Sequence, residues 1–256
     1  MARHGSVLIT GLATIAWLFG AGPAFAAEIK LLTAGAMRAV AIEMLPEFES
    51  KTGHKVSVDN ATAGTLAKRI EGGEAFDVAI ITPKIIDDLT QKGKIAAGSR
   101  IDLAKVGIGV AVKDGAVLPD IKTTEAFKRT LLDAKSVAYI DPKSGGSSGI
   151  YFDGLLDRLG IADAIRAKAK LKQGGYVAEL VANGDAEIAV HQISEIVSVK
   201  GATLVGPLPA EIQNFTTYAA GVSATAKDAA AAKALIDHLA GPAAAAVLKT
   251  KGMEKP

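Results

Sequence analysis

Three segments of small and hydroxyl residues could bind an anion without a countercharge. They are Ala34-Gly35-Ala36, Thr62-Ala63-Gly64-Thr65 and Gly146-Ser147-Ser148-Gly149, and each opens a segment with helical spacing. Free N–H groups and the positive dipole end of a helix start attract anions, and hydroxyls add donors. Ser and Thr are also preferred helix caps, so capping would explain any single segment equally well. Together they favour an anion site, with these candidate contacts: Ala34, Gly35, Ala36, Thr62, Gly64, Thr65, Ser147 and Ser148.

One of these segments also matches a motif of serine hydrolases. Gly145-Gly146-Ser147-Ser148-Gly149 reads G-x-S-x-G, and Asp185 and His191 follow in a known triad order. The serine of such a motif lies directly between a strand and a helix, whereas Asp141 to Ser144 intervene here. Asp185 and His191 are only six residues apart along one predicted strand, which is a poor layout for a triad. A serine hydrolase is therefore the alternative, and we expect no enzymatic activity.

Composition and motif spacing exclude several other function classes. The chain has no cysteine, which removes disulfides, thiolate metal sites and cysteine nucleophiles. The four histidines are scattered without a metal-binding spacing, and the glycine-rich stretches lack the nucleotide-binding patterns. We therefore expect no metal and no cofactor. A net charge of +2 without a stripe of Lys and Arg argues against a nucleic-acid partner.

The first 26 residues have the pattern of a secretory signal peptide. Arg3 and His4 precede an apolar run from Val7 to Phe19, and a Gly/Pro break follows it. Ala24-Phe25-Ala26 then supplies the small residues of a cleavage site. The run is shorter than the roughly 18 apolar residues that a membrane anchor needs. We predict residues 1–26 to be a signal peptide, cleaved before Ala27, and the mature chain to be periplasmic.

The first part of the mature chain alternates between strand and helix patterns. Short apolar or alternating runs predict strands, and apolar residues three and four apart predict helices. The predicted strands are Ile29 to Thr33, Lys55 to Asp59 and Asp77 to Ile81, and the predicted helices are Met37 to Glu49 and Thr62 to Ile70, with another after Pro83. This alternation is the signature of a parallel sheet built from βαβ units.

After an apolar strand at Val106 to Val112 the alternation starts again. The further predicted strands are Ser136 to Ile140, Ala186 to Val190, Thr203 to Val205 and Phe215 to Val222. The further predicted helices are Thr123 to Leu132, Ser147 to Leu159, Ile161 to Leu171, Tyr176 to Ala182, Ala226 to Leu239 and Pro242 to Lys251. The chain therefore contains two α/β units with no flexible linker between them.

Two α/β units without a linker indicate two lobes joined by strands. The apolar runs Val106 to Val112 and Phe215 to Val222 are the natural crossovers. We expect one lobe to comprise residues 27–109 plus 218–256 and the other residues 110–217. Such a hinge allows the lobes to close on a ligand by rigid-body motion.

Five segments, in order, resemble the type II periplasmic binding proteins, in the molybdate-binding-protein-like branch of ABC transporter receptors. They are AEIKLLTAGAMRAVAIEMLPEFESKTGHKVSV, ATAGTLAKRIEGGEAFDVAIITP, YIDPKSGGSSGIYFDGLLDRLGI, GGYVAELVANGDAEIAV and TTYAAGVSATAKDAAAAKALIDHLAGPAAAAVLKTKGM. The resemblance implies a two-lobe α/β fold, each lobe a mainly parallel sheet flanked by helices, with a strand hinge. It also implies a monomeric receptor that delivers a small anion to a membrane permease, and it adds Tyr176 to the candidate contacts.

Two positions depart from the pattern of the molybdate-binding branch. Those receptors usually have a serine after the first strand, where this chain has Ala34-Gly35-Ala36. They usually have a tyrosine where this chain has His191-Gln192. An imidazole can donate when neutral or carry charge when protonated, so His191 would suit a carboxylate or another oxyanion. The other explanation for His191 is a partly buried ring bonded to backbone. We expect a small oxyanion or carboxylate as ligand, with molybdate the less favoured choice.

Overall fold

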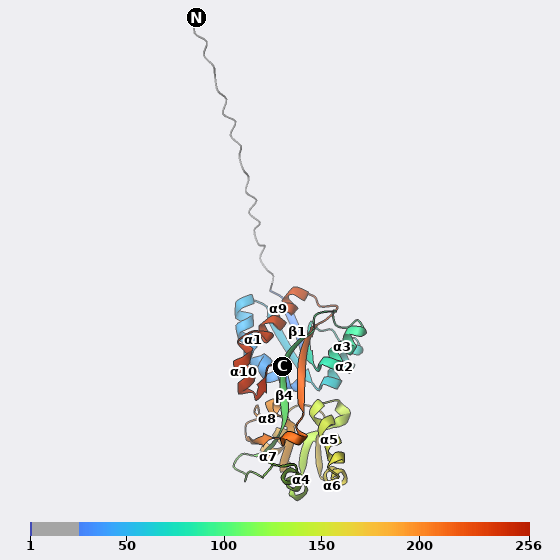
Figure 1. Ribbon diagram of the computed structural model, residues 1–256. Coiled ribbons are helices and arrows are strands. Elements are labelled where there is room, and N and C mark those ends of the chain that lie inside the picture. The colour runs from blue at the N-terminus through green and yellow to red at the C-terminus, as the bar shows by residue number, and fades with distance from the viewer. Residues whose placement is uncertain (2–25) are drawn as a thin grey trace.

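The computed structural model describes Met1 and residues 26–256, and the predicted signal peptide lies almost wholly outside these residues. The described chain forms two α/β lobes stacked end to end, with long strands passing from one to the other (Figure 1). This is the two-lobe architecture that the sequence predicts.

The strands form one sheet that extends through both lobes, in the order β2-β1-β3-β9-β4-β7-β5-β6, with β8 and β10 also paired to β4. Pairing is parallel among β1, β2 and β3 and among β5, β6 and β7, whereas β4 and β9 run antiparallel to their neighbours. The strands are β1 (Glu28–Ala34), β2 (Lys55–Ala61), β3 (Val78–Ile81), β4 (Ile101–Lys113), β5 (Val137–Ile140), β6 (Ala169–Lys172), β7 (Ile188–Gln192), β8 (Ala202–Pro207), β9 (Phe215–Val222) and β10 (Met253–Glu254).

The helices cover both faces of each part of the sheet (Figure 1). In the first lobe α1, α9 and α10 lie on one side of β1, and α2 and α3 lie on the other. The helices are α1 (Gly35–Thr52), α2 (Ala63–Glu71), α3 (Pro83–Gln91), α4 (Thr124–Asp133), α5 (Ser147–Arg158), α6 (Ala162–Arg166), α7 (Ala178–Asn183), α8 (Ile193–Ile196), α9 (Ala229–Ala240) and α10 (Ala244–Thr250), with the 3-10 turns η1 (Pro142–Ser144) and η2 (Ala210–Ile212).

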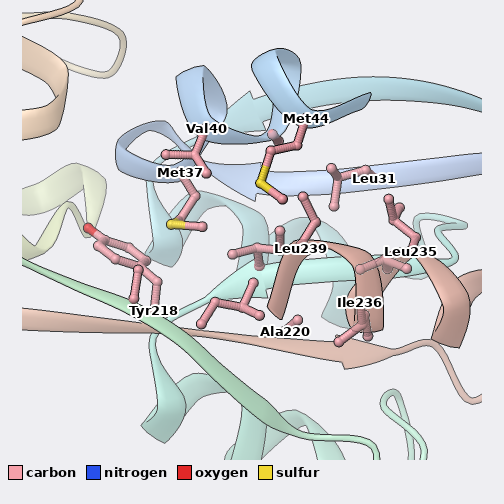
Figure 2. Packing of buried hydrophobic residues seen from close by; sticks show 14 of the residues in the cluster. Leu31, Met37, Val40, Met44, Tyr218, Ala220, Leu235, Ile236 and Leu239 are labelled. Atoms are coloured by element: carbon pink, nitrogen blue, oxygen red, sulfur yellow. The ribbon is translucent and has the colours of Figure 1, made fainter. Parts of the chain in front are cut away.

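The larger core of the first lobe holds the start of α1 in place. Met37 and Val40 on one face of α1 are buried against Leu239 of α9, and Leu31 of β1 completes the layer (Figure 2). Tyr218 of β9 lies at the edge of this cluster, 3% exposed. Truncating such a buried aliphatic side chain costs about 2–5 kcal/mol, so the helix start is firmly positioned.

The second lobe has its own core, built around three aromatic rings. The ring of Phe152 on α5 packs edge-on against that of Tyr139 on β5, with centroids 5.0 Å apart. Phe127 of α4 lies 6.4 Å from the other side of Phe152. This packing fixes α5, and therefore Ser147 at its first position, relative to the sheet.

β4 and β9 are the strands that connect the two lobes. β4 pairs with β9 from Ile101 to Gly107, and with β7 and β8 from Ile108 to Lys113. A single strand of 13 residues therefore contributes to both halves of the sheet. The boundaries that the sequence suggests, 109/110 and 217/218, fall within these two strands, and the position of the hinge stays a prediction.

One predicted helix is wrong over half its length. The apolar spacing predicts a helix from Ile161 to Leu171, but α6 ends at Arg166 and Ala169–Lys172 form β6. β6 pairs in parallel with β5, whose edge it completes. Helical spacing reports only on neighbouring residues in the chain. The edge of β5 has unpaired N–H and C=O groups, and pairing with them makes this segment a strand.

Within residues 26–256, no single helix has the length and apolar composition needed to cross a bilayer. α9 and α10 reach that length only together, and they are bent by 61° at the break between them.

Candidate functional site

A small pocket lies between the lobes, at the carboxyl ends of β1, β5 and β7. Its volume is about 30 Å³. It is lined by Ala34, Gly35, Thr62, Ala63, Ile140, Gly146, Ser147, Ser148, Gly175, His191, Gln192, Glu195 and Tyr218. In α/β sheets this edge is where ligands bind. Six of the ten residues predicted as ligand contacts therefore lie together here: Ala34, Gly35, Thr62, Ser147, Ser148 and His191.

Two of the helices that start at the pocket have no side-chain cap. α1 follows Ala34 and α5 follows Gly146, and neither residue offers a side-chain oxygen to the first N–H groups. α2 differs, because Thr65 N–H donates to Thr62 Oγ1 over 3.2 Å. Capping thus accounts for the hydroxyl of Thr62 but not for the starts of α1 and α5. The N–H groups there are available to an anion.

Gly64 and Thr65 hold the two lobes together and do not line the pocket. Gly64 N–H donates to Gly145 O over 3.1 Å, and the Thr65 hydroxyl donates to Ser144 O over 3.2 Å. The Thr62 hydroxyl also donates to Ser144 O. A Cβ on Gly64 would approach within 2.7 Å of Gly145 Cα, so only glycine permits this contact. The two lobes are therefore in direct contact at this point.

A connected set of neutral side chains, which we call the hydroxyl side, comprises Ser147, Gln192 and Tyr218 in the pocket lining and Thr216 just outside it. Ser147 Oγ lies 3.2 Å from Tyr218 OH and accepts from Gln192 Nε2 over 3.1 Å. Gln192 Nε2 also donates to Thr216 Oγ1 over 3.0 Å. Burial raises the pKa of Tyr218 well above its usual range, so its phenol keeps its proton. Tyr218 of β9 thus supplies a phenol to the pocket, although the chain has no tyrosine directly after β7.

The same contacts argue against a serine hydrolase. The polar partners of Ser147 Oγ are Tyr218 and Gln192, and neither is a general base. His191 forms no hydrogen bond with Ser147 within the described part of the chain, although a triad requires that bond. Asp185 does not line the pocket. Ser147 is therefore placed as a hydrogen-bonding residue.

His191 and Glu195 form a second part of the pocket lining, which we call the acid side. Their exposures are 2% and 7%, and His191 Nε2 lies 3.5 Å from Glu195 Oε2. Burial, aided by the charge of Lys172, lowers the pKa of His191 to about 3. Burial alone raises the pKa of Glu195 to about 8. The two groups are therefore a neutral pair at pH 7 and not a salt bridge.

The start of α1 opposes the neutral state of Glu195, but too weakly to reverse it. A Cβ on Gly35 would collide with Glu195 Oε1, which places the carboxyl against the first turn of α1. A helix start favours a carboxylate by at most ~2 kcal/mol. A pKa rise from 4.5 to about 8 corresponds to roughly 5 kcal/mol. Burial therefore decides, and the carboxyl remains protonated at neutral pH.

Several buried polar atoms at the pocket have no partner. Within residues 26–256 these are His191 Nδ1, Gln192 Oε1 and, just outside the lining, Ser194 Oγ. The other explanation for His191, a ring bonded to backbone, is therefore not what the structure has. Buried polar groups are nearly always paired in proteins, and exceptions often mark functional sites.

The structure separates some predicted contacts from the pocket and adds others. Ala36 is buried in the core behind Gly35, and Tyr176 lines a separate surface hollow beside Arg38. Sequence reasoning missed Glu195 and Tyr218. Glu195 is four residues after His191, a spacing that could have suggested a pair, but the strand predicted before it gave no reason to expect a helix.

No group of three or more His, Asp or Glu side chains in the described part of the chain could hold a metal ion. The ionisable residues that line the pocket are His191, Glu195 and Tyr218, and none of them is a cation at pH 7. An anion would therefore be held by N–H groups, hydroxyls and dipoles and not by an opposite charge.

Comparison with known proteins identifies the family. Residues 29–254 match the family described as bacterial extracellular solute-binding protein. The chain is 32% identical to an aconitate isomerase from a Pseudomonas species over 253 residues, 95% of each chain. It is 28% identical to the molybdate-binding protein ModA of Azotobacter vinelandii over 243 residues, covering 89% of this chain and 90% of that one.

The fold agrees with these relatives. The structure of the periplasmic molybdate-binding protein of Azotobacter vinelandii superposes with a TM-score of 0.75 at 20% identity, covering 89% of this chain and 99% of that one. Relatives named as binding proteins and one named as an enzyme therefore share nearly the whole length of this chain. The chain belongs to the bacterial extracellular solute-binding proteins and is a type II periplasmic binding protein of the molybdate-binding-protein-like branch.

Proposed function

We propose that this protein is the extracytoplasmic receptor of an ABC uptake system, and that it captures a small oxyanion or carboxylate between its lobes. The observation that carries the proposal is the pocket that joins the uncapped starts of α1 and α5 to neutral donors. Such a site binds oxygen anions through N–H groups whose dipoles are already oriented. The permease of the system would be its membrane partner.

Both ligand chemistries present oxygen atoms that accept hydrogen bonds. Relatives of similar length are named for molybdate, an inorganic oxyanion, and for aconitate, a carboxylate. In this chain Ala34 stands where the molybdate-binding branch usually has a serine. His191 and Gln192 stand where it usually has a tyrosine, and His191 belongs to the buried acid side. These differences favour a ligand other than molybdate, although the class of ligand stays the same.

A thermal-shift screen of the exported chain tests the proposal. The candidate anions are molybdate, tungstate, sulfate, phosphate, citrate and both aconitate isomers. A true ligand should raise Tm by an amount that grows with the logarithm of its concentration above Kd. The proposal fails if none of these anions raises Tm. N-terminal sequencing of the periplasmic form should start at Ala27 if the signal peptide is cleaved as proposed.

A second candidate function is isomerisation of an unsaturated carboxylate. Glu195 supplies the observation in its favour, because a buried carboxyl with a pKa of about 8 in a ligand pocket can exchange protons near neutral pH. In its ionised form, which is about a tenth of the population at pH 7, Glu195 would remove a proton from a CH₂ next to a C=C bond. The electron pair would shift along the three-carbon unit, and the proton would return at its far end. The double bond moves with no net change in atoms or electrons.

The size of the pocket limits this second candidate. A cavity that admits a six-carbon ring such as benzene measures ~150 Å³, whereas this pocket measures about 30 Å³. The lobes would have to open further around a tricarboxylate. Incubation with cis-aconitate or trans-aconitate in D₂O, followed by proton NMR, tests the activity. Absence of both interconversion and deuterium incorporation would leave the receptor function alone.

A further inference from the structure

The carboxyl group of Glu195 lies where a captured anion would bring its negative charge. It lines the pocket, and its Oε1 occupies the space in front of Gly35. Gly35 is the first residue of α1, an 18-residue helix whose start has no side-chain cap. An anion bound at this helix start would therefore lie beside the carboxyl.

The ionisable groups around Glu195 do not include a cation paired with it. His191 on β7, with Nε2 at 3.5 Å from Oε2, and Tyr218 on β9 are the ionisable side chains that share the pocket with it. The charge of Lys172 on β6 helps to lower the pKa of His191, whereas burial alone raises the pKa of Glu195. This holds for the residues that the structure describes.

The other elements packed against α8 bring no charge to the carboxyl either. β8 has no ionisable side chain, and β4 meets α8 near Gly109, against which Ile193 packs. The first ionisable residue of α1 is Arg38, which lines the separate hollow with Tyr176. An ionised Glu195 would therefore repel an anion, and no cation on these elements would offset that repulsion.

We propose that Glu195 holds a proton in the pocket and donates it in a hydrogen bond to an oxygen of the captured anion, so that capture requires this proton. The inference rests on the proposed function. A neutral carboxylic acid is a donor, and a hydrogen bond from it to a charged oxygen is of the stronger, charge-assisted kind. The neutral ring of His191 beside it leaves the proton on the carboxyl.

The first measurement reads the proton itself. Infrared difference spectra of the exported chain at pH 7, wild type minus Glu195→Gln, should contain the C=O stretch of a protonated carboxylic acid. That band should change to carboxylate bands as the pH passes about 8, the pKa of Glu195. Glu125→Gln, exposed on α4, is the matched control and should remove no such band. A Glu195 found ionised at pH 7 overturns the inference.

The second measurement reads the linkage in the wild-type chain, by titration calorimetry with molybdate and with trans-aconitate. Each probe is measured at pH 7 and pH 9, in two buffers of different ionisation enthalpy. With a pKa of about 8, binding should be about tenfold weaker at pH 9 and should take up about 0.9 proton per anion there. Glu195→Gln, which keeps a donor but does not titrate, should bind equally at both pH values.

The outcomes separate this inference from the proposed function. Wild-type binding that is independent of pH and takes up no proton at pH 9 overturns the role of Glu195 and leaves the receptor function intact. If neither probe binds at pH 7 and no anion of the thermal-shift screen raises Tm, while the protonated band is present, the anion-receptor function fails, and the donor role of Glu195 fails with it. Because the calorimetry uses the wild type, it does not depend on the folding of the variant.

Discussion

The two sides of the pocket differ in how well their own polar groups are paired. On the hydroxyl side, Ser147 and Tyr218 contact each other and Gln192 donates to Ser147, although Gln192 Oε1 has no partner within the described residues. On the acid side, His191 Nδ1 has no partner within the described residues, and its Nε2 is 3.5 Å from Glu195. Apart from the half-buried Ser147, the side chains of both sides are buried, and at neutral pH both sides are uncharged.

The difference separates two roles within one small pocket. The hydroxyl side is held in place by its own hydrogen bonds, so it can orient a ligand without reorganising. The acid side leaves one buried atom, His191 Nδ1, unpaired within the described residues, which costs about 1–3 kcal/mol. Its two ionisable groups are also shifted in opposite directions, so this side makes both stability and binding depend on pH.

Crowding the acid side should have the largest effect. In Gly35→Ala the new Cβ would collide with Glu195 Oε1, so the carboxyl or the helix start must move. Overpacking of this kind costs roughly 1–3 kcal/mol of stability. We expect anion affinity to fall by about tenfold to a hundredfold. Gly174→Ala is the matched control, since its Cβ would meet only Thr62 Cγ2 at 4.0 Å. Calorimetry that finds equal affinities for the two variants would contradict this placement of Glu195.

The acid side should also produce a stability maximum in mildly acidic solution. The pKa of Glu195 rises from 4.5 to about 8 on folding, so its contribution is lost as the pH rises through that window. The pKa of His191 falls from 6.5 to about 3, so its contribution is lost as the pH falls through that range. The two trends oppose each other between 4.5 and 6.5. Each loss is on the order of a few kcal/mol.

Urea unfolding between pH 4 and pH 9 measures this profile. Glu195→Gln should abolish the loss above pH 6.5, because the other carboxyl groups with a resolved shift have lowered pKa values; Glu74, bonded to Arg69, is one. Those carboxyl groups also contribute to the loss of stability at acidic pH, so His191→Gln should reduce that loss without abolishing it. An alkaline limb that is unchanged in Glu195→Gln would show that burial does not hold the proton there.

Removing a donor from the hydroxyl side should have a smaller effect without pH dependence. Tyr218→Phe deletes one hydroxyl, while Ser147 keeps its bond to Gln192. A lost hydrogen bond to a charged ligand is worth about 1.5 kcal/mol at the low end of its range, which applies here because the Ser147 hydroxyl stays in place as a donor, so affinity should fall about tenfold. Tyr151→Phe, whose hydroxyl donates to Ile212 O outside the pocket, is the control. If the loss of anion affinity in Tyr218→Phe depended on pH, the hydroxyl side and the acid side would not have separate roles.

The contact between the lobes should matter least, because it touches neither side of the pocket. Thr65→Val removes the bond to Ser144 O across the lobes. About 1 kcal/mol of closed-state stability is lost, so affinity should fall about fivefold. Thr90→Val, which removes a hydroxyl bond within α3, should leave affinity unchanged. Small-angle scattering at subsaturating ligand should show a larger fraction of open molecules in Thr65→Val than in Thr90→Val. Equal scattering from the two variants would show that the hydrogen bond from Thr65 to Ser144 O does not hold the lobes together.

Local sequence patterns predicted most helices and strands well, but they failed where pairing with a strand distant in the chain determines the conformation of a segment. The apolar run of β5 and the helix that starts at Ser147 can be recognised from a few consecutive residues. Ala169–Lys172 could not be, because its conformation depends on the edge of β5. Among the site residues, the helix starts were found because anion binding by N–H groups needs only small residues at one place in the chain. Glu195 and Tyr218 carry no local signal of a ligand.

The sequence alone determined the two-lobe α/β fold, the family and the segments that face each other across the pocket. Alternating short patterns and ordered motifs are local, and parallel βαβ units leave few ways to arrange them. Only the tertiary structure decided that α1 and α5 lack caps, that Gly64 contacts Gly145, and that the acid side is neutral. These properties depend on burial and on distances between residues far apart in the chain, which a linear pattern does not contain.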